Sequence, residues 1–336
     1  MRGTVLLSLL STLFLGLPAE SAVLIPVTPP SGSTSTVVYG INDSNVITGY
    51  YQTSDGVQHG FVGPLNGAYT TFDYGETYTN PRAINNNGYI TGTADNGGLD
   101  IQFERNPGGE IATITMEGFP AGSGLIVQGI NSKGVFVGNY LKVGALAAYY
   151  GKNAQYQSDF VLPDGSTDAD PRGINDSGAV AGFIVRDETR TSDGFVVEKG
   201  VETLIDYPDP DVAFTFFQSI NKHGTVAGYW TEKNLKRPHA FTYDSGAGTF
   251  KQIKVPHSKD VEAYGINSAG LVTIDADTGA FIYCPYSLAS GRCPSAGIEI
   301  VDAAPIQSAP VSVLRARHHA GGHPPSVYSA LSWGRP

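Results

Sequence analysis

The chain has 336 residues, of which 15% are charged, against roughly 25% in an ordinary soluble domain. Asp and Glu outnumber Lys and Arg by 31 to 21, so the formal net charge is -10 and no basic stripe indicates nucleic-acid binding. A composition rich in Gly, Tyr, Thr and Asn argues against a coiled coil or a helical bundle, and two cysteines are too few for a disulfide-dense scaffold.

Residues 1–21 have the pattern of a secretory signal peptide. Arg2 supplies a positive charge, residues 5–17 form an apolar run, and a small-x-small cleavage site ends at Ser21. The apolar run is shorter than the ~20 residues that a membrane-spanning helix needs. The sequence therefore predicts a secreted protein that is not held in a membrane once the leader is removed.

One segment recurs six times along the chain. Each copy contains an Ile-Asn pair, and in five copies a Gly stands three residues after the Asn. The asparagines are 43 to 46 residues apart: Asn42, Asn85, Asn131, Asn175, Asn221 and Asn267. Repetition at a nearly constant spacing of this length is the signature of a repeat architecture.

Each copy is interpreted as a β-hairpin. The Asn side chain can accept a hydrogen bond from the backbone two residues on, and the following Gly can take the positive φ that closes a tight turn. A second Gly, seven residues after the Asn, allows two backbones to approach closely and is replaced by Ile274 in the sixth copy. The repeated asparagines are therefore expected to be structural residues and not ligands.

Two further strand signals follow in most copies. One is a short apolar piece such as residues 239–242, and the other precedes a Pro, Gly or Asp turn, as in residues 203–207. Four strands in about 45 residues predict an all-β, six-bladed β-propeller over residues 22–308, with a β-solenoid as the alternative. Residues 23–29 and residues 298–301 both have the pattern of the last blade's fourth strand, which leaves the closure of the ring open.

Three further signals concern covalent modification and the end of the chain. Cys284 and Cys293 are expected to form a disulfide, because the predicted compartment is oxidising. Asn42 and Asn175 stand in formal glycosylation sequons, although both also belong to the repeated turn. Residues 309–336 abandon the repeat and are predicted to be a disordered tail.

Alignment of the copies on the Asn gives rings of equivalent residues. Three positions before the Asn, in an otherwise apolar strand, every side chain can donate hydrogen bonds: Tyr39, Arg82, Gln128, Arg172, Gln218 and Tyr264. If this strand lines a central channel, the six side chains converge there, and two arginines suit an oxyanion or an enolised ketone. The alternative is that they bond the turns between blades.

Aromatic residues follow the Asn by eight or nine positions. The candidates for a pocket wall are Tyr50, Tyr140, Phe183, Tyr229 and Trp230. They suit an apolar ligand pocket, and they suit packing between blades equally well. No nucleophile elbow, zinc-helix motif, P-loop or EF-hand loop is present in the sequence, so neither a metal nor a cofactor is predicted.

The Gly-Ile-Asn-x-x-Gly hairpin, the piece His239-Ala240-Phe241 and the strand Phe72-Asp73-Tyr74 resemble the extracellular repeats named after His-Ala-Phe, over about residues 25–305. In length, leader and repeat content the chain is also similar to the fungal hetero-Diels–Alderases of tropolone–sesquiterpenoid pathways. The resemblance implies a cofactor-independent enzyme with small apolar or aromatic substrates. It would couple a tropolone-derived o-quinone methide to a humulene-type sesquiterpene.

The resemblance also suggests roles for the two sets of residues. The residues expected to bind the tropolone oxygens are Arg82, Arg172, Tyr39 and Tyr264. The residues expected to enclose the substrates are Gln128, Gln218, Tyr50, Tyr140, Phe183, Tyr229 and Trp230. The alternatives are a secreted binding module and a six-bladed hydrolase or lactonase, the latter disfavoured because the ring offers Arg, Gln and Tyr where carboxylates and amides would hold calcium.

Overall fold

The computed structural model describes residues 21–118, 124–142, 145–162, 169–186, 191–294 and 297–308. Within these ranges the regular structure is β-strand, apart from one 3-10 turn at Leu288–Ser290 (η1), so the predicted all-β class is confirmed. None of these residues belongs to a helix long and apolar enough to cross a membrane. The predicted tail, and the predicted leader except for Ser21, lie outside the described residues.

The strands pair into sheets that follow one another along the chain, and each of the first three sheets has four antiparallel strands in chain order. The first contains β2 (Ser35–Ile41), β3 (Val46–Gln52), β4 (Gln58–Pro64) and β5 (Thr70–Phe72). The second contains β6 (Thr79–Ile84), β7 (Ile90–Asn96), β8 (Leu99–Arg105) and β9 (Ile111–Thr113). The third contains β10 (Ile126–Ile130), β11 (Val135–Lys142), β12 (Ala145–Lys152) and β13 (Gln155–Phe160).

Two further sets of four strands are joined into one sheet. The first set is β14 (Ala169–Ile174), β15 (Val180–Arg186), β16 (Thr191–Glu198) and β17 (Val201–Ile205). The second set is β18 (Val212–Ile220), β19 (Thr225–Glu232), β20 (Pro238–Asp244) and β21 (Thr249–Gln252). A single parallel pair, Ser192 with Phe214, connects the two sets, and the two-residue strand β26 (Ile306–Gln307) adds to β21, which makes nine strands in all.

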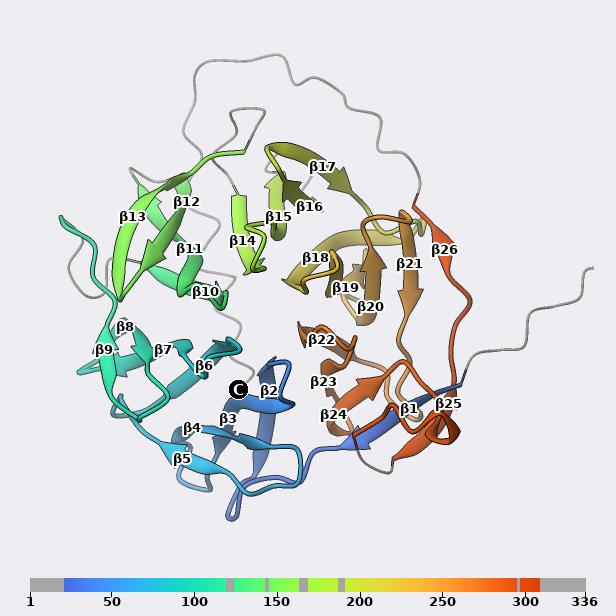
Figure 1. Cartoon of the computed structure of the whole chain (residues 1–336), viewed down its shortest axis with the longest axis horizontal. Coiled ribbons are helices and arrows are strands. Elements are labelled where there is room, and N and C mark those ends of the chain that lie inside the picture. Colours follow the sequence, from blue (N-terminus) through green and yellow to red (C-terminus); the bar gives the residue numbers. More distant parts are fainter. Residues whose placement is uncertain are drawn as a thin grey trace, which may run out of the picture.

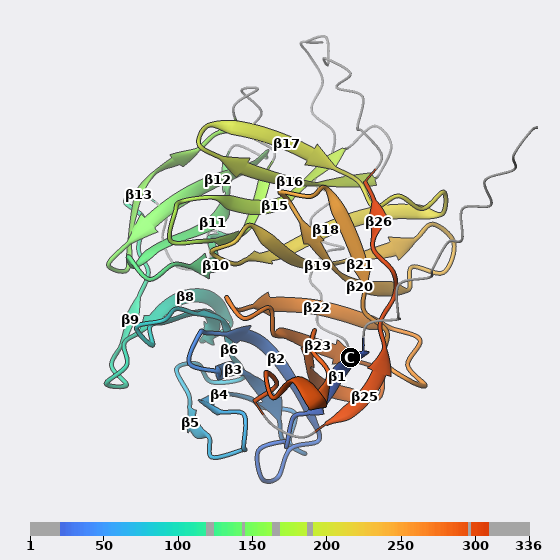
Figure 2. The same ribbon diagram turned by 45° about the vertical axis from the view of Figure 1, so that its right-hand side comes forward.

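The last sheet joins the two ends of the described chain. Its strands, in spatial order, are β22 (Val261–Ile266), β23 (Val272–Ala276), β24 (Gly279–Cys284), β1 (Ser21–Pro26) and β25 (Ile298–Val301). The N-terminal strand β1 lies between β24 and β25 and is antiparallel to both (Figure 1). Figure 2 shows β1 beside β25 from another side. The closure that the sequence left open therefore uses both candidate segments, β1 as the fourth strand and β25 as the fifth.

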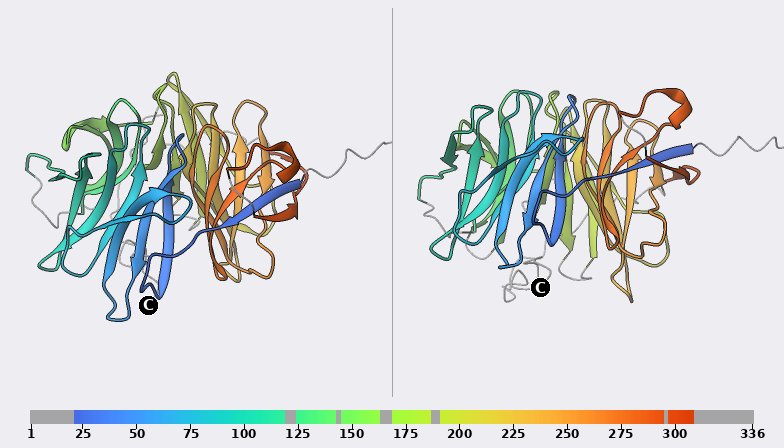
Figure 3. Two further views of the ribbon diagram at one scale, coloured as in Figure 1. Left: turned by 60° about the horizontal axis from the view of Figure 1, so that its bottom comes forward. Right: turned by 90° about the horizontal axis from the view of Figure 1, so that it is seen from below.

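The sheets stand side by side around a central axis, with β2, β6, β10, β14, β18 and β22 nearest to it (Figure 1). Seen from the side, the strands run across the thickness of a disc (Figure 3). Antiparallel four-stranded units arranged radially around a channel are the architecture of a β-propeller. This arrangement differs from the stacked coils of a β-solenoid, the alternative that the repeat spacing allowed.

The repeated hairpin has the turn chemistry that the sequence predicts. In the first copy, Asn42 Oδ1 accepts hydrogen bonds from the backbone N–H groups of Ser44 and Val46, both at 3.0 Å. The residue three positions after the Asn has a positive φ in every copy, including the one copy without Gly, where Asn45 has φ 59°. Asn tolerates this left-handed conformation better than other non-glycine residues, which explains the substitution.

The second Gly of the repeat serves two contacts at once. A Cβ on Gly182 would lie 2.2 Å from the carbonyl oxygen of Asp170 and 2.8 Å from the ring of Phe195. The carbonyl belongs to the strand that bulges opposite the Gly, and Phe195 is the residue paired with Gly182 on the other side. The Gly therefore lets a fully buried aromatic ring cover the bulge, which fixes the core between neighbouring sheets.

The predicted disulfide between Cys284 and Cys293 is present. Cys284 ends β24 and is fully buried, and its Cα lies 5.9 Å from that of Cys293. The bond ties the loop that contains η1 to the sheet in which the chain ends meet.

Candidate functional site

Small residues line the channel. They stand two positions before each Asn: Gly40, Ala83, Gly129, Gly173, Ser219 and Gly265. A Cβ on Gly129 would lie 2.6 Å from the Arg172 carbonyl oxygen, and one on Gly173 would lie 2.7 Å from the Ser219 Cα. Neighbouring inner strands thus touch backbone to backbone here.

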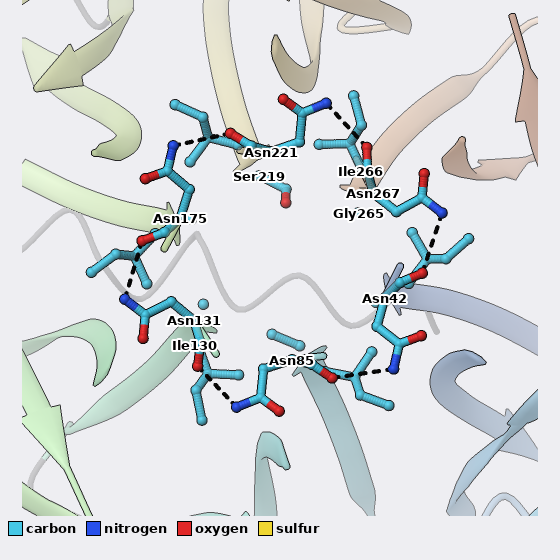
Figure 4. Close-up of a pocket in the computed structure, with 18 of the residues that line it drawn as sticks. Asn42, Asn85, Ile130, Asn131, Asn175, Ser219, Asn221, Gly265, Ile266 and Asn267 are labelled. Atoms are coloured by element: carbon cyan, nitrogen blue, oxygen red, sulfur yellow. Dashed lines mark hydrogen bonds between the residues drawn. The ribbon is translucent and has the colours of Figure 1, made fainter. Parts of the chain in front are cut away.

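The six asparagines form a closed hydrogen-bonded ring around the channel (Figure 4). Each side-chain amide nitrogen donates to the main-chain carbonyl of the next Asn, over 2.9 to 3.2 Å: Asn42 to Asn85, Asn85 to Asn131, Asn131 to Asn175, Asn175 to Asn221, Asn221 to Asn267, and Asn267 back to Asn42. The sequence predicted only the turn. The signal for the ring was the Asn in all six copies, since a turn alone also accepts Asp or Ser.

The same ring bears on the glycosylation sequons. Asn42 and Asn175 are 5% and 6% exposed, and their Nδ2 atoms are hydrogen bonded inside the ring. Nδ2 is the atom that a glycan would occupy. The prediction that these two residues carry glycans is therefore incompatible with the folded ring, and their role is that of turn and ring residues.

A cavity of about 120 Å³ lies in the channel and is lined by the predicted polar ring. Its walls include all six members, Tyr39, Arg82, Gln128, Arg172, Gln218 and Tyr264. They come from β2, β6, β10, β14, β18 and β22, in each case from the position before the small residue. The structure thus brings together side chains that are up to 225 residues apart in the sequence.

Aromatic rings pack in a continuous line along one side of this ring of residues. We call this line the aromatic wall, and its members are Tyr50, Tyr39, Tyr264, Tyr229, Phe216 and Phe183. Successive ring centroids are 6.0, 4.7, 6.2, 5.0 and 4.8 Å apart. Only Tyr39 and Tyr264 line the cavity itself, and the other rings hold these two in place from behind.

The two arginines cover two separate rings of the aromatic wall, Tyr39 and Phe183. The Arg82 guanidinium lies 4.7 Å from the centroid of Tyr39, and that of Arg172 lies 5.0 Å from the centroid of Phe183. Such contacts between a cation and an aromatic face are stabilising, most strongly where water is excluded. They hold both guanidinium groups at the channel.

The electrostatic environments of the two arginines differ. Arg172 forms an ion pair with Asp170 at 2.6 Å, and Asn139 donates a second hydrogen bond to the same carboxylate at 2.7 Å. Among the described residues, Arg82 pairs with no carboxylate, and the buried Nε atoms of both arginines have no hydrogen-bond partner. Of the two arginines, Arg82 is therefore the one whose charge is not paired directly with a carboxylate.

The tyrosines of the cavity are neutral phenols at physiological pH. Burial raises the pKa values of Tyr39, Tyr229 and Tyr264 above the usual value of tyrosine, and the negative charge of Glu262 raises each of them further. The Tyr264 hydroxyl donates a hydrogen bond to Glu262. Tyr39 can therefore donate a hydrogen bond to a ligand oxygen, as the sequence-based proposal required, whereas Tyr264 has its one proton directed at Glu262 and offers a ligand only an acceptor.

Tyr140 and Trp230 lie away from the channel. Tyr140 is 3% exposed and donates a hydrogen bond to Asp159 at 2.7 Å, and the Trp230 ring is 5.0 Å from Tyr207 and 4.4 Å from His239, centroid to centroid. Successive residues of a strand point to opposite faces, so Tyr229 and Trp230 do not share one pocket. These two residues are therefore corrected from pocket candidates to core residues.

Phe216 and Glu262 belong to the site and were missed at the sequence level. Both stand five positions before the ring Asn, and therefore two positions before a member of the polar ring. The register pairs Phe216 with Tyr229 and Glu262 with Asp275, so this position faces the eighth residue after the Asn. Strand alternation, applied backwards from Gln218 and Tyr264, was the signal that would have found them.

No known family pattern matches the sequence, and no curated protein matches it. Among solved structures, a streptogramin B lyase is 9% identical, with 78% of this chain and 97% of that chain covered and a TM-score of 0.45. Virginiamycin B lyase from Staphylococcus aureus is 11% identical, with 79% and 99% covered and a TM-score of 0.47. The fucose-specific lectin from Aleuria aurantia is 10% identical, with 75% and 92% covered and a TM-score of 0.46.

At these identities and TM-scores, the β-propeller assignment rests on the sheet geometry and on the Asn ring of this chain.

Proposed function

We propose that this chain is a secreted, six-bladed β-propeller and a cofactor-independent hetero-Diels–Alderase. It would couple a tropolone-derived o-quinone methide to a humulene-type sesquiterpene in its central channel. Six ring asparagines and six inner strands support the blade count, with the nine-stranded sheet counted as two blades. The Cys284–Cys293 disulfide is compatible with the secretion that the leader predicts.

The observation that carries the proposal is the position of Arg82, which lines the cavity and, among the described residues, has no carboxylate paired with it. A guanidinium held at a channel without a paired carboxylate is a site for a ligand oxygen that carries or develops negative charge. Hydrogen bonds from Arg82 and from the neutral phenol of Tyr39 would withdraw electrons from a bound oxygenated ring. Such a ring becomes a better heterodiene for an electron-rich alkene.

The size of the cavity defines how the two reactants would be held. Its volume of about 120 Å³ is comparable to a cavity of ~150 Å³ that accepts one benzene molecule. The oxygenated ring would therefore occupy the cavity, and the alkene would approach it from the channel. Holding two reactants in a near-attack geometry can remove on the order of 7 kcal/mol from a bimolecular barrier.

The direct test is a reaction of the purified mature protein with a hydroxymethyl tropolone and a humulene alcohol. The products are separated by chiral, mass-resolved chromatography against a protein-free control. We expect faster formation of one stereoisomer in the presence of the protein. A product profile and a rate equal to the control would reject the proposal.

Arg82→Gln is expected to lower the turnover about 100-fold, the usual effect of removing one donor to a developing oxyanion. The matched control is Arg105→Gln, because Arg105 also lies 4.7 Å over an aromatic ring, that of Phe72, but does not line the cavity. Turnover of folded protein is measured for both variants. Equal losses in the two variants would show that Arg82 acts through the fold.

A non-enzymatic binding module is the second candidate. The observation in its favour is the cavity volume, which suits one ring. In that case small aromatic ligands would raise the melting temperature of the protein in proportion to their affinity. Ligand-induced shifts without any acceleration of the coupling reaction would favour this candidate over the enzyme.

A further inference from the structure

One residue row in the channel connects a positive charge to a negative one. The Arg82 guanidinium lies 4.7 Å over Tyr39, the Tyr39 ring meets Tyr264 edge to face at 4.7 Å, and the Tyr264 hydroxyl donates to the Glu262 carboxylate. Arg82, Tyr39 and Tyr264 all line the cavity. The row therefore presents a cation, two phenols and, behind the second phenol, a carboxylate to the same ligand.

The geometry of Tyr264 and Glu262 is that of a relay. The two residues are two positions apart on β22, and the hydrogen bond between their side chains shows that they lie on the same side of the strand. Because the hydroxyl proton of Tyr264 is donated to Glu262, the phenolic oxygen is left as an acceptor towards the cavity. A carboxylate that does not line the cavity is thereby connected to a ligand inside it.

We infer that this row is a proton-abstraction site for a ligand with an acidic hydroxyl on a conjugated ring, an inference that rests on the proposed binding of such a ring in the channel. The ligand O–H proton moves to the Tyr264 oxygen, and the Tyr264 proton moves to Glu262. The electron pair of the broken O–H bond stays on the ligand oxygen, which becomes an oxyanion beside Arg82. Charge and atoms balance without a further reactant.

The chemistry restricts the ligand class. An ordinary carboxylate is a weaker base than an ordinary phenolate by roughly six pKa units, so the transfer from a simple phenol is strongly unfavourable. Conjugation to a carbonyl, as in an enolised ketone, makes the ligand hydroxyl more acidic and so reduces the difference between its pKa and that of a carboxyl group. The charge of Arg82 reduces this difference further, because an opposite charge within a few ångströms favours the ionised form of the ligand.

The groups that face Glu262 are Tyr264 on its own strand, Asp275 directly opposite it on β23, Tyr229 on β19 and Tyr39 on β2. Burial and the Glu262 charge raise the pKa of Tyr264 well above the usual value of tyrosine. Tyr264 therefore stays protonated at neutral pH, and it accepts a proton from the ligand only as it gives its own proton to Glu262. The residue that changes charge at the end of the row is Glu262.

The test uses 4-nitrophenol, which is an acidic hydroxyl on a conjugated ring and is not a substrate for the coupling reaction. At a pH one unit below its own pKa, about one tenth of the free probe is the coloured anion. We expect most of the probe bound to the wild-type protein to be the anion. Calorimetry in two buffers of different ionisation heat should show no net proton release, because Glu262 keeps the proton.

Glu262→Gln is expected to change the proton count to about one proton released per anion bound, and Tyr264→Phe and Arg82→Gln to reduce the bound anion severalfold. Tyr140→Phe is the matched control, since it also removes a phenol that donates to a carboxylate, but outside the channel. It should behave as the wild type.

Binding of the neutral probe only, no binding at millimolar probe, or an unchanged proton count in Glu262→Gln would overturn the inference. Ionisation of the probe without any coupling activity would reject the proposed enzyme and leave the proton-abstraction site in place.

Discussion

The Asn of each repeat satisfies its side chain with three hydrogen bonds. In the third copy, Asn131 Oδ1 accepts from the N–H groups of Lys133 and Val135, both at 3.0 Å, and Nδ2 donates to the Asn175 carbonyl at 3.1 Å. The residue is 5% exposed. A buried side chain with this pattern holds both its own turn and the neighbouring repeat, and neither Asp nor Ser can make all three bonds.

Asn131→Ala is therefore expected to lower the free energy of unfolding by about 3 kcal/mol, because two part-buried N–H groups lose their acceptor and the buried Asn175 carbonyl loses one of its two donors. The measurement is urea unfolding, with Asn234→Ala in an exposed loop as the control, for which a change near zero is expected. A loss of less than ~0.5 kcal/mol in Asn131→Ala would show that the ring does not contribute to stability.

The phenol of Tyr140 contributes to the stability of the fold below alkaline pH. Burial, together with the hydrogen bond to Asp159 and the charge of that carboxylate, raises the pKa of Tyr140 to about 12. A group whose pKa is higher in the folded state stabilises the fold below its unfolded pKa of about 10 and loses this contribution as the pH rises towards the folded value. The stability of the wild type should fall between these two values.

Urea unfolding at a series of pH values above and below 10 should show this fall, and Tyr140→Phe should lack that part of it. The phenol of Tyr140 is the group that separates the two proteins, so their free energies of unfolding should converge as the pH approaches 12. Parallel curves for the two proteins would contradict the assignment.

At the level of elements, the hairpins follow from local sequence and the last sheet does not. Ile-Asn-x-x-Gly with two flanking apolar runs defines a turn and two strands within one copy. The hairpins of all six copies are present, including the first, in which Asn45 replaces the Gly. The position of β1 depends on a contact with β24 and β25 at the other end of the chain. Both candidate segments carry the same strand pattern, so periodicity alone does not order them.

The strand β1 is expected to be essential to the fold. Ala22, Val23 and Leu24 are fully buried and belong to the cores on the two faces of the last sheet. Leu24→Ala should lower the free energy of unfolding by about 3 kcal/mol, the usual result of a cavity at a buried Leu. Ile298→Ala, at an exposed residue of the neighbouring β25, should change it little, and equal losses in the two variants would argue against the central position of β1.

The whole molecule is closed at one seam by several kinds of contact. Asn267 donates to Asn42 across it, β1 lies between two C-terminal strands, and the segment after β25 is held by the Asp302 carboxylate, which pairs with Lys251 and accepts from the Tyr283 hydroxyl. In a closed ring each sheet packs on two neighbours. Opening the seam would expose the cores of two sheets together.

The Cys284–Cys293 disulfide fixes the loop beside this seam. Replacing both residues by Ala should lower the free energy of unfolding by roughly 2.7 kcal/mol, the chain-entropy value for a loop of this length. The measurement is urea unfolding of the oxidised wild type and of the double variant. Equal free energies of unfolding would show that the disulfide does not stabilise the fold by reducing the conformational entropy of the unfolded chain.

The repeat spacing and the turn residues were sufficient for the all-β class, the hairpins and the convergence of Tyr39, Arg82, Gln128, Arg172, Gln218 and Tyr264, because equivalent residues of a repeat occupy equivalent places. Tertiary structure alone decided that Asp170 neutralises Arg172 while Arg82 has no carboxylate, and that Tyr140 and Trp230 face the core. It also decided that Glu262 lies behind Tyr264. These features depend on side chains that differ between copies, so the period of the repeat carries no information about them.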